Sequence, residues 1–302
     1  MLADDRDRYV ALHRALGFKF RIQAGLLRSF VAFAEARGDR TVLAARVLEW
    51  ARQAPSPAQR RNRLLTVRRF ALAMYAEDPR HEAPAADALG AARHERVRPH
   101  IWTADEIARL MNATALLGQA GSTRPLLYRT LFGLLAATGL RISEALALRV
   151  RDIGEDGLLV LGTKFRKSRL VPIHDTTRRA LGAFIGAYPA HADAPLFRSD
   201  AGIGPAYRTV DGVFLRLTRA VGLRGAAGQA GPRIHDLRHT FAVRSLQECG
   251  SDQAAVARHM AGLSTYLGHA HVTDTYWYLQ ATPTLMTGIA EAGEALHRGE
   301  TS

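Results

Sequence analysis

The feature that most constrains the fold is a break in the apolar pattern between residues 78 and 100. On both sides apolar residues recur at helical spacings, whereas this segment loses that periodicity and gains Pro, Ala, Gly and Arg, which is typical of a linker. A chain of 302 residues can form two domains that each bury a core. We therefore predict a domain over 1–95, a linker region over 78–100 and a second domain over 101–302.

The first domain is predicted to be helical. Phe30, Val31 and Phe33 recur at spacings that make one apolar face. Ser56 followed by Pro57 is typical of a capped helix start, because Ser can accept a hydrogen bond from the first turn and Pro fits there.

The second domain is predicted to combine helices with a small antiparallel sheet. Thr103-Ala-Asp-Glu106 is a capping-box pattern that begins a helix, and two short strands fit residues 158–162 and 168–173. Further helices are expected at 124–138, 142–149, 175–188, 207–221, 235–248 and 284–297. The fold class is thus mainly α with two domains, the second of mixed α/β type.

Composition narrows the class of partner. The chain carries 41 Lys and Arg against 28 Asp and Glu, a formal net charge of +13, which favours nucleic acid. Its single cysteine excludes an intramolecular disulfide framework. No apolar run approaches the roughly 20 residues that cross a bilayer, and the charged N-terminus does not resemble a signal peptide. We therefore expect a cytoplasmic protein without a membrane partner.

The segment Thr138-Gly-Leu-Arg141-Ile-Ser-Glu144 is the first along the chain that contains candidate functional residues. Gly139 is expected to end one helix, and Ser143 or Thr138 can cap the next. Arg141 would then lie at a helix N-terminus, where backbone N–H groups already favour an anion. The alternative is a purely structural ion pair between Arg141 and Glu144 at helical spacing.

Lysine is rare, since it occurs only at Lys19, Lys164 and Lys167 and 38 of the 41 basic residues are arginine. Two of the three lysines lie in the predicted turn that ends at Arg169. A solvated basic turn is one interpretation, in which Lys167 and Arg169 are candidate DNA contacts. A functional one is proton donation to a leaving oxygen, because lysine can shift its pKa whereas a guanidinium essentially cannot.

His235 and Arg238 are three residues apart in Ile234-His-Asp-Leu-Arg-His239, so on a helix both side chains project from one face. His235 and His239 could instead ligate zinc, since an i, i+4 pair suits that metal. No third ligand follows nearby, and an adjacent arginine opposes a cation. We therefore predict no metal site.

The last segment runs from Tyr266-Leu-Gly268-His269 to Tyr276-Trp-Tyr278. Gly268 is expected to end a helix and to leave His269 at the start of the next element. Either Tyr276 or Tyr278 could be a core aromatic residue with a hydrated hydroxyl, which is the usual fate of tyrosine.

Together these four segments describe a clamp for a phosphodiester. Two arginines can neutralise the non-bridging oxygens, two histidines can donate to or accept from the same phosphate, and a lysine can protonate the departing oxygen. A tyrosine can act as nucleophile and form a phosphotyrosyl ester. The chain has neither an acidic metal cluster nor a Gly-x-x-x-x-Gly-Lys loop, so we expect no cofactor.

At this point the sequence resembles the tyrosine recombinases of the phage integrase family. The resemblance covers Pro57–Tyr75, similar to part of a helical, SAM-like core-binding domain, and 101–280, similar to the DNA breaking-rejoining catalytic domain. Glu144 corresponds to the acidic support of the first arginine. The six family positions are filled in order by Arg141, Lys164, His235, Arg238, His269 and Tyr278.

The resemblance implies the reaction and the partners. The family's tyrosine follows the last histidine by nine residues, which selects Tyr278 over Tyr276. A 3′-phosphotyrosine, a Holliday junction and a homotetramer on double-stranded DNA would follow, with the 284–297 segment docking on a neighbouring subunit or folding back on its own domain. A looser similarity to transposon and recombinase-in-trio members suggests a mobile element and other recombinases of that element as partners.

Two alternatives stay open. A type IB topoisomerase shares the same residue set and relaxes supercoils as a monomer, and a non-cutting DNA-binding subunit of a multi-recombinase complex would need no nucleophile. In the first domain, five arginines within ten residues are candidate phosphate contacts, unless they only form a solvated helix face: Arg60, Arg61, Arg63, Arg68 and Arg69.

Overall fold

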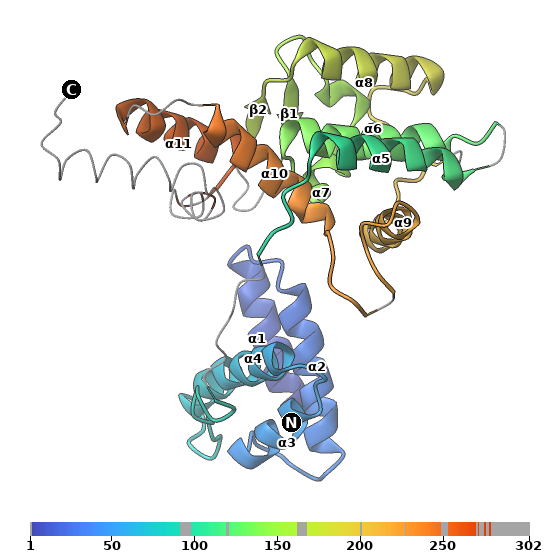
Figure 1. The fold of residues 1–302 in the computed structure, drawn as a ribbon. Helices are drawn as coiled ribbons and strands as arrows, with labels where there is room; N and C mark the ends of the chain where they lie inside the picture. Colours follow the sequence, from blue (N-terminus) through green and yellow to red (C-terminus); the bar gives the residue numbers. More distant parts are fainter. Residues whose placement is uncertain are drawn as a thin grey trace, which may run out of the picture. The chain divides into compact units, whose positions relative to one another are not determined.

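The computed structural model divides the chain into two compact units, Met1–Val97 and Arg98–Ser302 (Figure 1). Each unit buries a hydrophobic core of its own. The structure describes residues 2–90, 98–118, 121–161, 168–199, 201–226, 228–248, 253–269, 271, 275 and 278.

The N-terminal unit is helical. Its described elements are α1 Leu2–Ala15, α2 Arg21–Glu35, α3 Ala44–Arg52 and α4 Pro57–Tyr75. Leu27, Phe30 and Phe70 are fully buried at its centre, and the Trp50 ring packs edge-on against Phe30 with a centroid distance of 5.5 Å. The apolar faces predicted from the sequence therefore form one core.

Local chemistry sets where α4 begins. The Ser56 hydroxyl accepts a hydrogen bond from the Gln59 backbone N–H at 3.3 Å, and Pro57 occupies the first turn. Both features match the sequence prediction.

The C-terminal unit surrounds the buried helix α6. In chain order its described elements are α5 Ala104–Ala113, η1 Thr114–Leu117, α6 Arg124–Thr138, α7 Ile142–Ala145, η2 Val150–Asp152, β1 Leu158–Val160, β2 Arg169–Val171, α8 Asp175–Ala187, α9 Tyr207–Ala220, α10 Ile234–Gln247 and α11 Gln253–Leu267. Leu131, Phe132 and Leu135 on α6 are at most 1% exposed. Helix α6 contacts α5, α8 and α10, and α5 runs beside it in Figure 1.

The small sheet pairs β1 and β2 antiparallel, with Leu158 opposite Val171 and Val160 opposite Arg169. Leu158, Val160 and Val171 are buried, while Leu159 and Leu170 on the other face are exposed. This alternation is expected of strands with one face on a core. The mainly α fold class with a small antiparallel sheet is confirmed.

The helix expected at 142–149 is much shorter than predicted. Helix α7 ends at Ala145, and the chain then forms an isolated antiparallel bridge between Arg149 and Pro195. The Asp152 carboxylate also accepts a hydrogen bond from the Arg149 backbone N–H at 2.8 Å. These tertiary partners outweigh the local preference for helix.

Two further sequence predictions concern the C-terminal part of the chain. The sequence analysis placed a helix end at Gly268 without defining the helix before it, which is α11. The helix expected at 284–297 lies outside the described residues. Within the described residues, no helix is both long and apolar enough to cross a membrane.

Candidate active site

Arg141 lies at the junction of α6 and α7. Gly139 ends α6 in the left-handed region at φ 60°, and an added Cβ there would lie 2.6 Å from Cδ1 of Phe241, so glycine is required on both counts. The predicted caps are wrong, because Thr138 donates back to the Leu134 carbonyl and Arg141 is the N-cap of α7, which begins at Ile142.

The ion pair between Arg141 and Glu144 is present. The Arg141 Nη1 donates to Glu144 Oε1 at 2.7 Å, and its backbone N–H donates to Oε2 at 3.0 Å. Glu144 is 7% exposed. Burial acts to raise the pKa of its carboxyl, but hydrogen bonds from Arg169 and from the Arg141 backbone outweigh burial and hold that pKa at about 2. The carboxylate is therefore charged and fixed.

Arg238 is almost fully buried in α10, with 2% of the residue exposed. Its Nη1 donates to the Gly139 carbonyl at 2.7 Å and its Nη2 to the Leu267 carbonyl at 2.8 Å. Burial and the nearby Arg141 charge lower the pKa of Arg238 to about 10, although the charge of Tyr278 and a hydrogen bond with it act in the opposite direction. The group stays positively charged at neutral pH.

The two arginines meet at the end of α11. Arg141 Nη1 also approaches the Leu267 carbonyl at 3.4 Å, and its Nη2 donates to the Gly268 carbonyl at 3.1 Å. The last carbonyls of a helix carry partial negative charge and suit guanidinium donors. Residues from α6, α7, α10 and α11 thus bring two cations together although almost 100 residues separate them in sequence.

Tyr278 belongs to the same site. It is 3% exposed and packs in a cluster with Val243, Leu246 and Leu263. Its phenol lies close enough to Arg238 to influence the pKa of that guanidinium. The phenol ring lies 6.0 Å from the His269 ring and nearly parallel to it. Tyr278, the tyrosine that the family resemblance selected, therefore lies close to the buried guanidinium of Arg238.

His269 follows the left-handed Gly268, whose φ is 68°. The His269 backbone N–H donates to the Ser264 carbonyl at 3.0 Å. Its Nδ1 is joined to Thr275 Oγ1 by a hydrogen bond of 2.7 Å. Thr275 is fully buried and was missed by the sequence analysis, since no local pattern links a threonine to a histidine six residues earlier.

His235 keeps part of its surface open to solvent. Crowding by the surrounding protein and the Arg238 charge nevertheless lower the pKa of its imidazole, so the ring is neutral at pH 7. Its ring lies 4.7 Å from that of His239, which in turn lies 5.4 Å from the Tyr278 ring. His239 therefore packs beside Tyr278. The sequence analysis had considered His239 only as a zinc ligand. Within the described residues, no group of three or more potential ligands could hold a metal ion.

Arg169 was predicted as a candidate DNA contact. Its Nη1 and Nη2 donate to the two oxygens of Glu144 at 3.1 and 2.9 Å, and its Nε donates to the Tyr266 carbonyl at 2.8 Å. Only 12% of the side chain is exposed. In this structure, therefore, the Arg169 guanidinium is engaged within the protein, and its role as a DNA contact stays a prediction. Lys164, Lys167 and Tyr276 lie outside the described residues.

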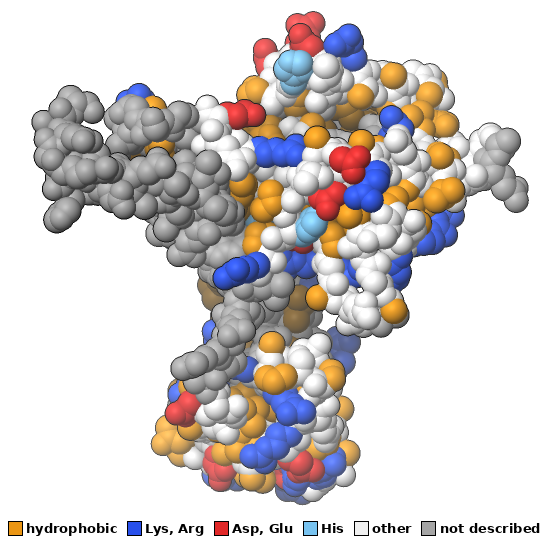
Figure 2. All heavy atoms as spheres, in the orientation of Figure 1, with side chains coloured by type: hydrophobic (Ala, Val, Ile, Leu, Met, Phe, Trp, Pro, Cys, Tyr) orange, Lys and Arg blue, Asp and Glu red, His pale blue; other side chains and the backbone are white. Residues whose placement is uncertain are grey.

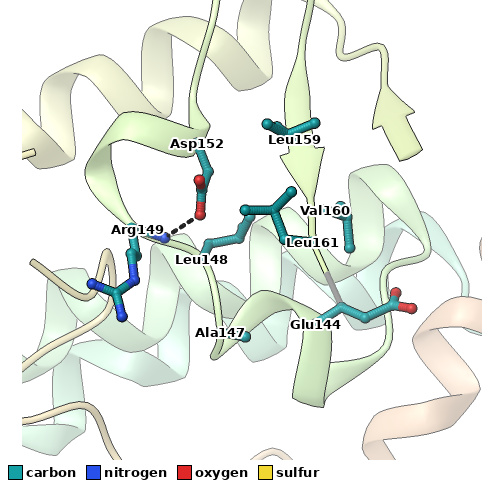
Figure 3. Close-up of a pocket in the computed structure, with 8 residues that line it drawn as sticks. All are labelled: Glu144, Ala147, Leu148, Arg149, Asp152, Leu159, Val160 and Leu161. Atoms are coloured by element: carbon teal, nitrogen blue, oxygen red, sulfur yellow. Dashed lines mark hydrogen bonds between the residues drawn. The ribbon is translucent and has the colours of Figure 1, made fainter. Parts of the chain in front are cut away.

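A cavity of about 110 Å³ lies on another side of Glu144 (Figure 3). Arg149 and Asp152 line it together with Leu159 and other residues. Figure 3 shows the Glu144 carboxylate directed away from Arg149 and Asp152. That pair therefore does not compete for the carboxylate that holds the arginines.

The α4 arginines of the N-terminal unit make fewer hydrogen bonds within the protein than the arginines of the site. Arg60 donates to the Ala54 carbonyl, Arg63 to the Trp50 carbonyl and Arg68 to the Pro84 carbonyl. Arg69 is exposed, and Arg61 is partly exposed. Basic, acidic and hydrophobic side chains share the visible face of this unit (Figure 2). Arg61 and Arg69 are thus the best placed of the five to meet a phosphate.

Comparisons with known proteins agree with this geometry. Residues 101–284 match the pattern of the phage integrase family. The candidate integrase/recombinase y4rB of Sinorhizobium fredii is 39% identical over 295 residues, which cover 92% of this chain and 92% of that protein. Tyrosine recombinase XerD of Rhizobium meliloti is 31% identical over 222 residues, which cover 72% of this chain and 68% of that protein.

Solved structures share the fold. The Tn1549 transposon integrase in complex with transposon right end DNA gives a TM-score of 0.64 at 18% identity, covering 92% of this chain and 94% of that one. A lambda integrase dimer bound to a COC′ core site gives 0.63 at 20% identity, covering 91% and 76%. The chain therefore belongs to the phage integrase family, and it is a tyrosine recombinase.

Proposed function

We propose that this recombinase cuts and rejoins double-stranded DNA through a 3′-phosphotyrosine at Tyr278. The observation that carries the proposal is the meeting of three groups. Arg141 and Arg238 approach the same Leu267 carbonyl, and the buried Tyr278 ring lies 5.4 Å from the ring of His239, the residue that follows Arg238. A phosphate bound by both guanidinium groups would lie beside the phenolic oxygen.

The electrostatics of the site favour an anion. Within the described residues, Arg141, Arg169 and Arg238 bring three positive charges to the one negative charge of Glu144. A pentacoordinate phosphorus develops additional negative charge on its non-bridging oxygens, and fixed guanidinium groups stabilise that charge more than they stabilise the ground state. This excess of positive charge supports phosphoryl transfer.

The proposed step exchanges one ester for another. The Tyr278 oxygen bonds to phosphorus while the bond from phosphorus to the 5′ oxygen breaks. The phenolic proton passes to a base, for which neutral His235 is suited, and the leaving 5′ oxygen takes a proton from Lys164. Attack by a 5′-hydroxyl of a second duplex reverses the step and restores the phenol. Each ester bond that breaks is replaced, so neither ATP nor an oxidant is required.

The wider assembly is part of the same proposal. A lambda integrase tetramer bound to a Holliday junction has the same fold as this chain, and the Tn1549 integrase was solved with transposon DNA. We extend a tetramer, a Holliday junction and a mobile-element substrate to this protein on that likeness. The expectation that 284–297 docks on a neighbour and that other recombinases take part belongs to the same extension, as does a cytoplasmic location.

Trapping the covalent intermediate tests the chemistry and does not require a defined target sequence. The probe is a pool of duplexes with a randomised core and a nick, from which the fragment between the cut and the nick diffuses away. The expected result is an adduct that survives denaturation, with the phosphotyrosyl peptide at Tyr278. Tyr278→Phe should abolish the adduct, and the matched variant Tyr276→Phe should keep it.

The same experiment distinguishes the alternatives. Absence of any adduct from the wild-type protein, with DNA binding intact, would favour a non-cutting subunit. An adduct accompanied by relaxation of plasmid DNA without junction formation would favour a topoisomerase. The reverse pattern of the two tyrosine variants would move the nucleophile to Tyr276.

The proton donor has its own test. Lys164→Arg should slow cleavage because a guanidinium is a poor acid, and a 5′-thio leaving group, which departs without a proton, should restore the rate. Lys167→Arg is the matched control and should cleave both substrates at the wild-type rate. Failure of the thio substrate to rescue Lys164→Arg would assign the proton to another group.

A further inference from the structure

Arg169 ties three elements of the site together. It extends from β2, holds both oxygens of Glu144 in α7, and holds the carbonyl of Tyr266 in the last turn of α11. Tyr266 immediately precedes Leu267 and Gly268, whose carbonyls accept from the two site arginines. The side chain therefore supports the carboxylate that orients Arg141 and also the peptide segment that holds Arg141 and Arg238.

The packing around this guanidinium leaves little freedom. A Cβ at Gly268 would lie 2.7 Å from Nη1 of Arg169, so only glycine lets the end of α11 approach so closely. All three guanidinium nitrogens donate within the protein. Two parallel bonds to one carboxylate match the planar fork of arginine and cannot be reproduced by lysine.

We propose that Arg169 is a positioning residue of the recombination site, which sets the geometry of Arg141 and Arg238 through Glu144 and the end of α11. This inference rests on the proposed function. In sequence, Arg169 follows the proposed proton donor Lys164 by five residues. Arg169 thus anchors β2 to the part of the site that holds the two arginines.

The charges that face Glu144 are consistent with this role. Arg141 approaches from α7, Arg169 from β2, and Arg238 from α10 is near enough for the carboxylate to affect its pKa. Arg149 and Asp152 lie on the side away from the carboxylate (Figure 3). Removing Arg169 would leave a buried carboxylate with one cation in place of two, so Arg141 would lose the fixed partner that orients it.

Substitutions that separate charge from geometry test the proposal. Arg169→Lys keeps the charge and Arg169→Met removes it, whereas both remove the bidentate contact. Arg198→Met is the matched control, because Arg198 is also partly buried and bound to backbone carbonyls of the same unit but contacts no residue of the site. DNA affinity, its salt dependence and the single-turnover cleavage rate at saturating DNA are measured with the nicked duplex selected by the wild-type protein.

Both Arg169 variants are expected to cleave roughly 10- to 100-fold more slowly, the scale of a misplaced catalytic group, with unchanged DNA affinity and salt slope. Arg198→Met should cleave at the wild-type rate. If Arg169→Lys behaves as wild type while Arg169→Met lowers the salt slope by about 0.9, Arg169 is a phosphate contact and the proposal is overturned.

A second measurement stands apart from cleavage. Unfolding free energies of wild type, Arg169→Met, Glu144→Gln and the double variant form a cycle that reports the coupling of the two side chains. We expect the double variant to be less destabilised than the sum of the single ones. Additive effects would overturn the positioning role even if the wild-type protein cut no DNA, so failure of the proposed function and failure of this inference give different results.

Discussion

Arginine is held in two different ways in the two units. In the C-terminal unit, Arg141 and Arg238 are bound by carbonyls at the ends of helices, and Arg238 is 2% exposed. In the N-terminal unit, the arginines of α4 lie partly or fully at the surface, and each of the bound ones donates to one backbone carbonyl. Burying a charge is costly, so it is expected where geometry matters, whereas surface charge suffices for affinity.

The largest expected effect is on the cleavage rate, when the buried guanidinium of Arg238 is replaced. Arg238→Lys should slow cleavage at saturating DNA by roughly 10²- to 10³-fold, the scale for loss of one preorganised donor. The reason is that a lysine cannot bind the Gly139 and Leu267 carbonyls and a phosphate together. Arg68→Lys on α4 is the control and should cleave normally in the same single-turnover assay. Equal losses in both variants would contradict the distinction.

The buried carboxylate of Glu144 should make the stability of the C-terminal unit depend on pH. Its pKa is about 2 in the folded protein against an ordinary 4.5, so its stabilising contribution is complete above about pH 4.5 and is lost as the pH falls toward 2. Glu144→Gln should lower the unfolding free energy by roughly 3 kcal/mol at pH 7 and by less at pH 3.5. Urea denaturation at both pH values measures this difference.

The control for that experiment lies in the other unit. Glu49 pairs with Arg46 at the surface, and 45% of the Glu49 side chain is exposed. Glu49→Gln should change the unfolding free energy by under about 1 kcal/mol at either pH. A Glu144→Gln deficit that stays constant with pH would contradict the low carboxyl pKa.

Gly38 in the N-terminal unit and Gly139 in the C-terminal unit differ in how well each position should tolerate alanine. Gly38 has φ 79° with no neighbouring atom within 4 Å of an added Cβ, whereas Gly139 has φ 60° and Phe241 in the way. Gly38→Ala should cost about 1 kcal/mol of unfolding free energy from the backbone alone. Gly139→Ala should cost roughly 2 to 3 kcal/mol, because overpacking adds to it. Equal losses of unfolding free energy in the two variants would contradict the steric conflict with Phe241 at Gly139.

The smallest effect concerns affinity. Arg61→Ala with Arg69→Ala should reduce the log–log salt slope of duplex binding by roughly 1.8, because each phosphate that is no longer neutralised accounts for about 0.9. The cleavage rate at saturating DNA should not change. Arg63→Ala serves as comparison, since its guanidinium lies 4.7 Å from the Trp50 ring centroid and is bound to the Trp50 carbonyl. A slope equal to wild type in the double variant would exclude Arg61 and Arg69 from the interface.

The sequence predicted those parts of the fold that local chemistry determines. Helix starts with a side-chain cap, at Ser56 and Thr103, and helix ends at Gly139 and Gly268 agree with the structure. Helix α7 was predicted too long because its end depends on the bridge to Pro195, about 45 residues away in the chain. The helical spacing of the apolar residues Val256, Met260, Leu263 and Leu267 is a local signal that could have defined α11.

For the candidate site, residue types were easier to predict than partners. Local patterns singled out Arg141 and Arg238, the family resemblance selected Tyr278, and all three lie in one region of the structure. The pairing of Arg169 was not predicted, because a basic turn looks the same in sequence whether its arginine meets solvent or a buried carboxylate. Pairing with Glu144, 25 residues earlier, depends on the packing of β2 against α7, which no local pattern encodes.

The shared carbonyl of Leu267 has a thermodynamic consequence. One peptide oxygen accepts from both Arg141 and Arg238, so a rotation of that peptide would release both at once. Although each arginine keeps other partners, we expect this shared acceptor to couple the two energetically. Losing the second after the first should cost much less than losing it alone, and the energetic penalties of the two substitutions should be subadditive.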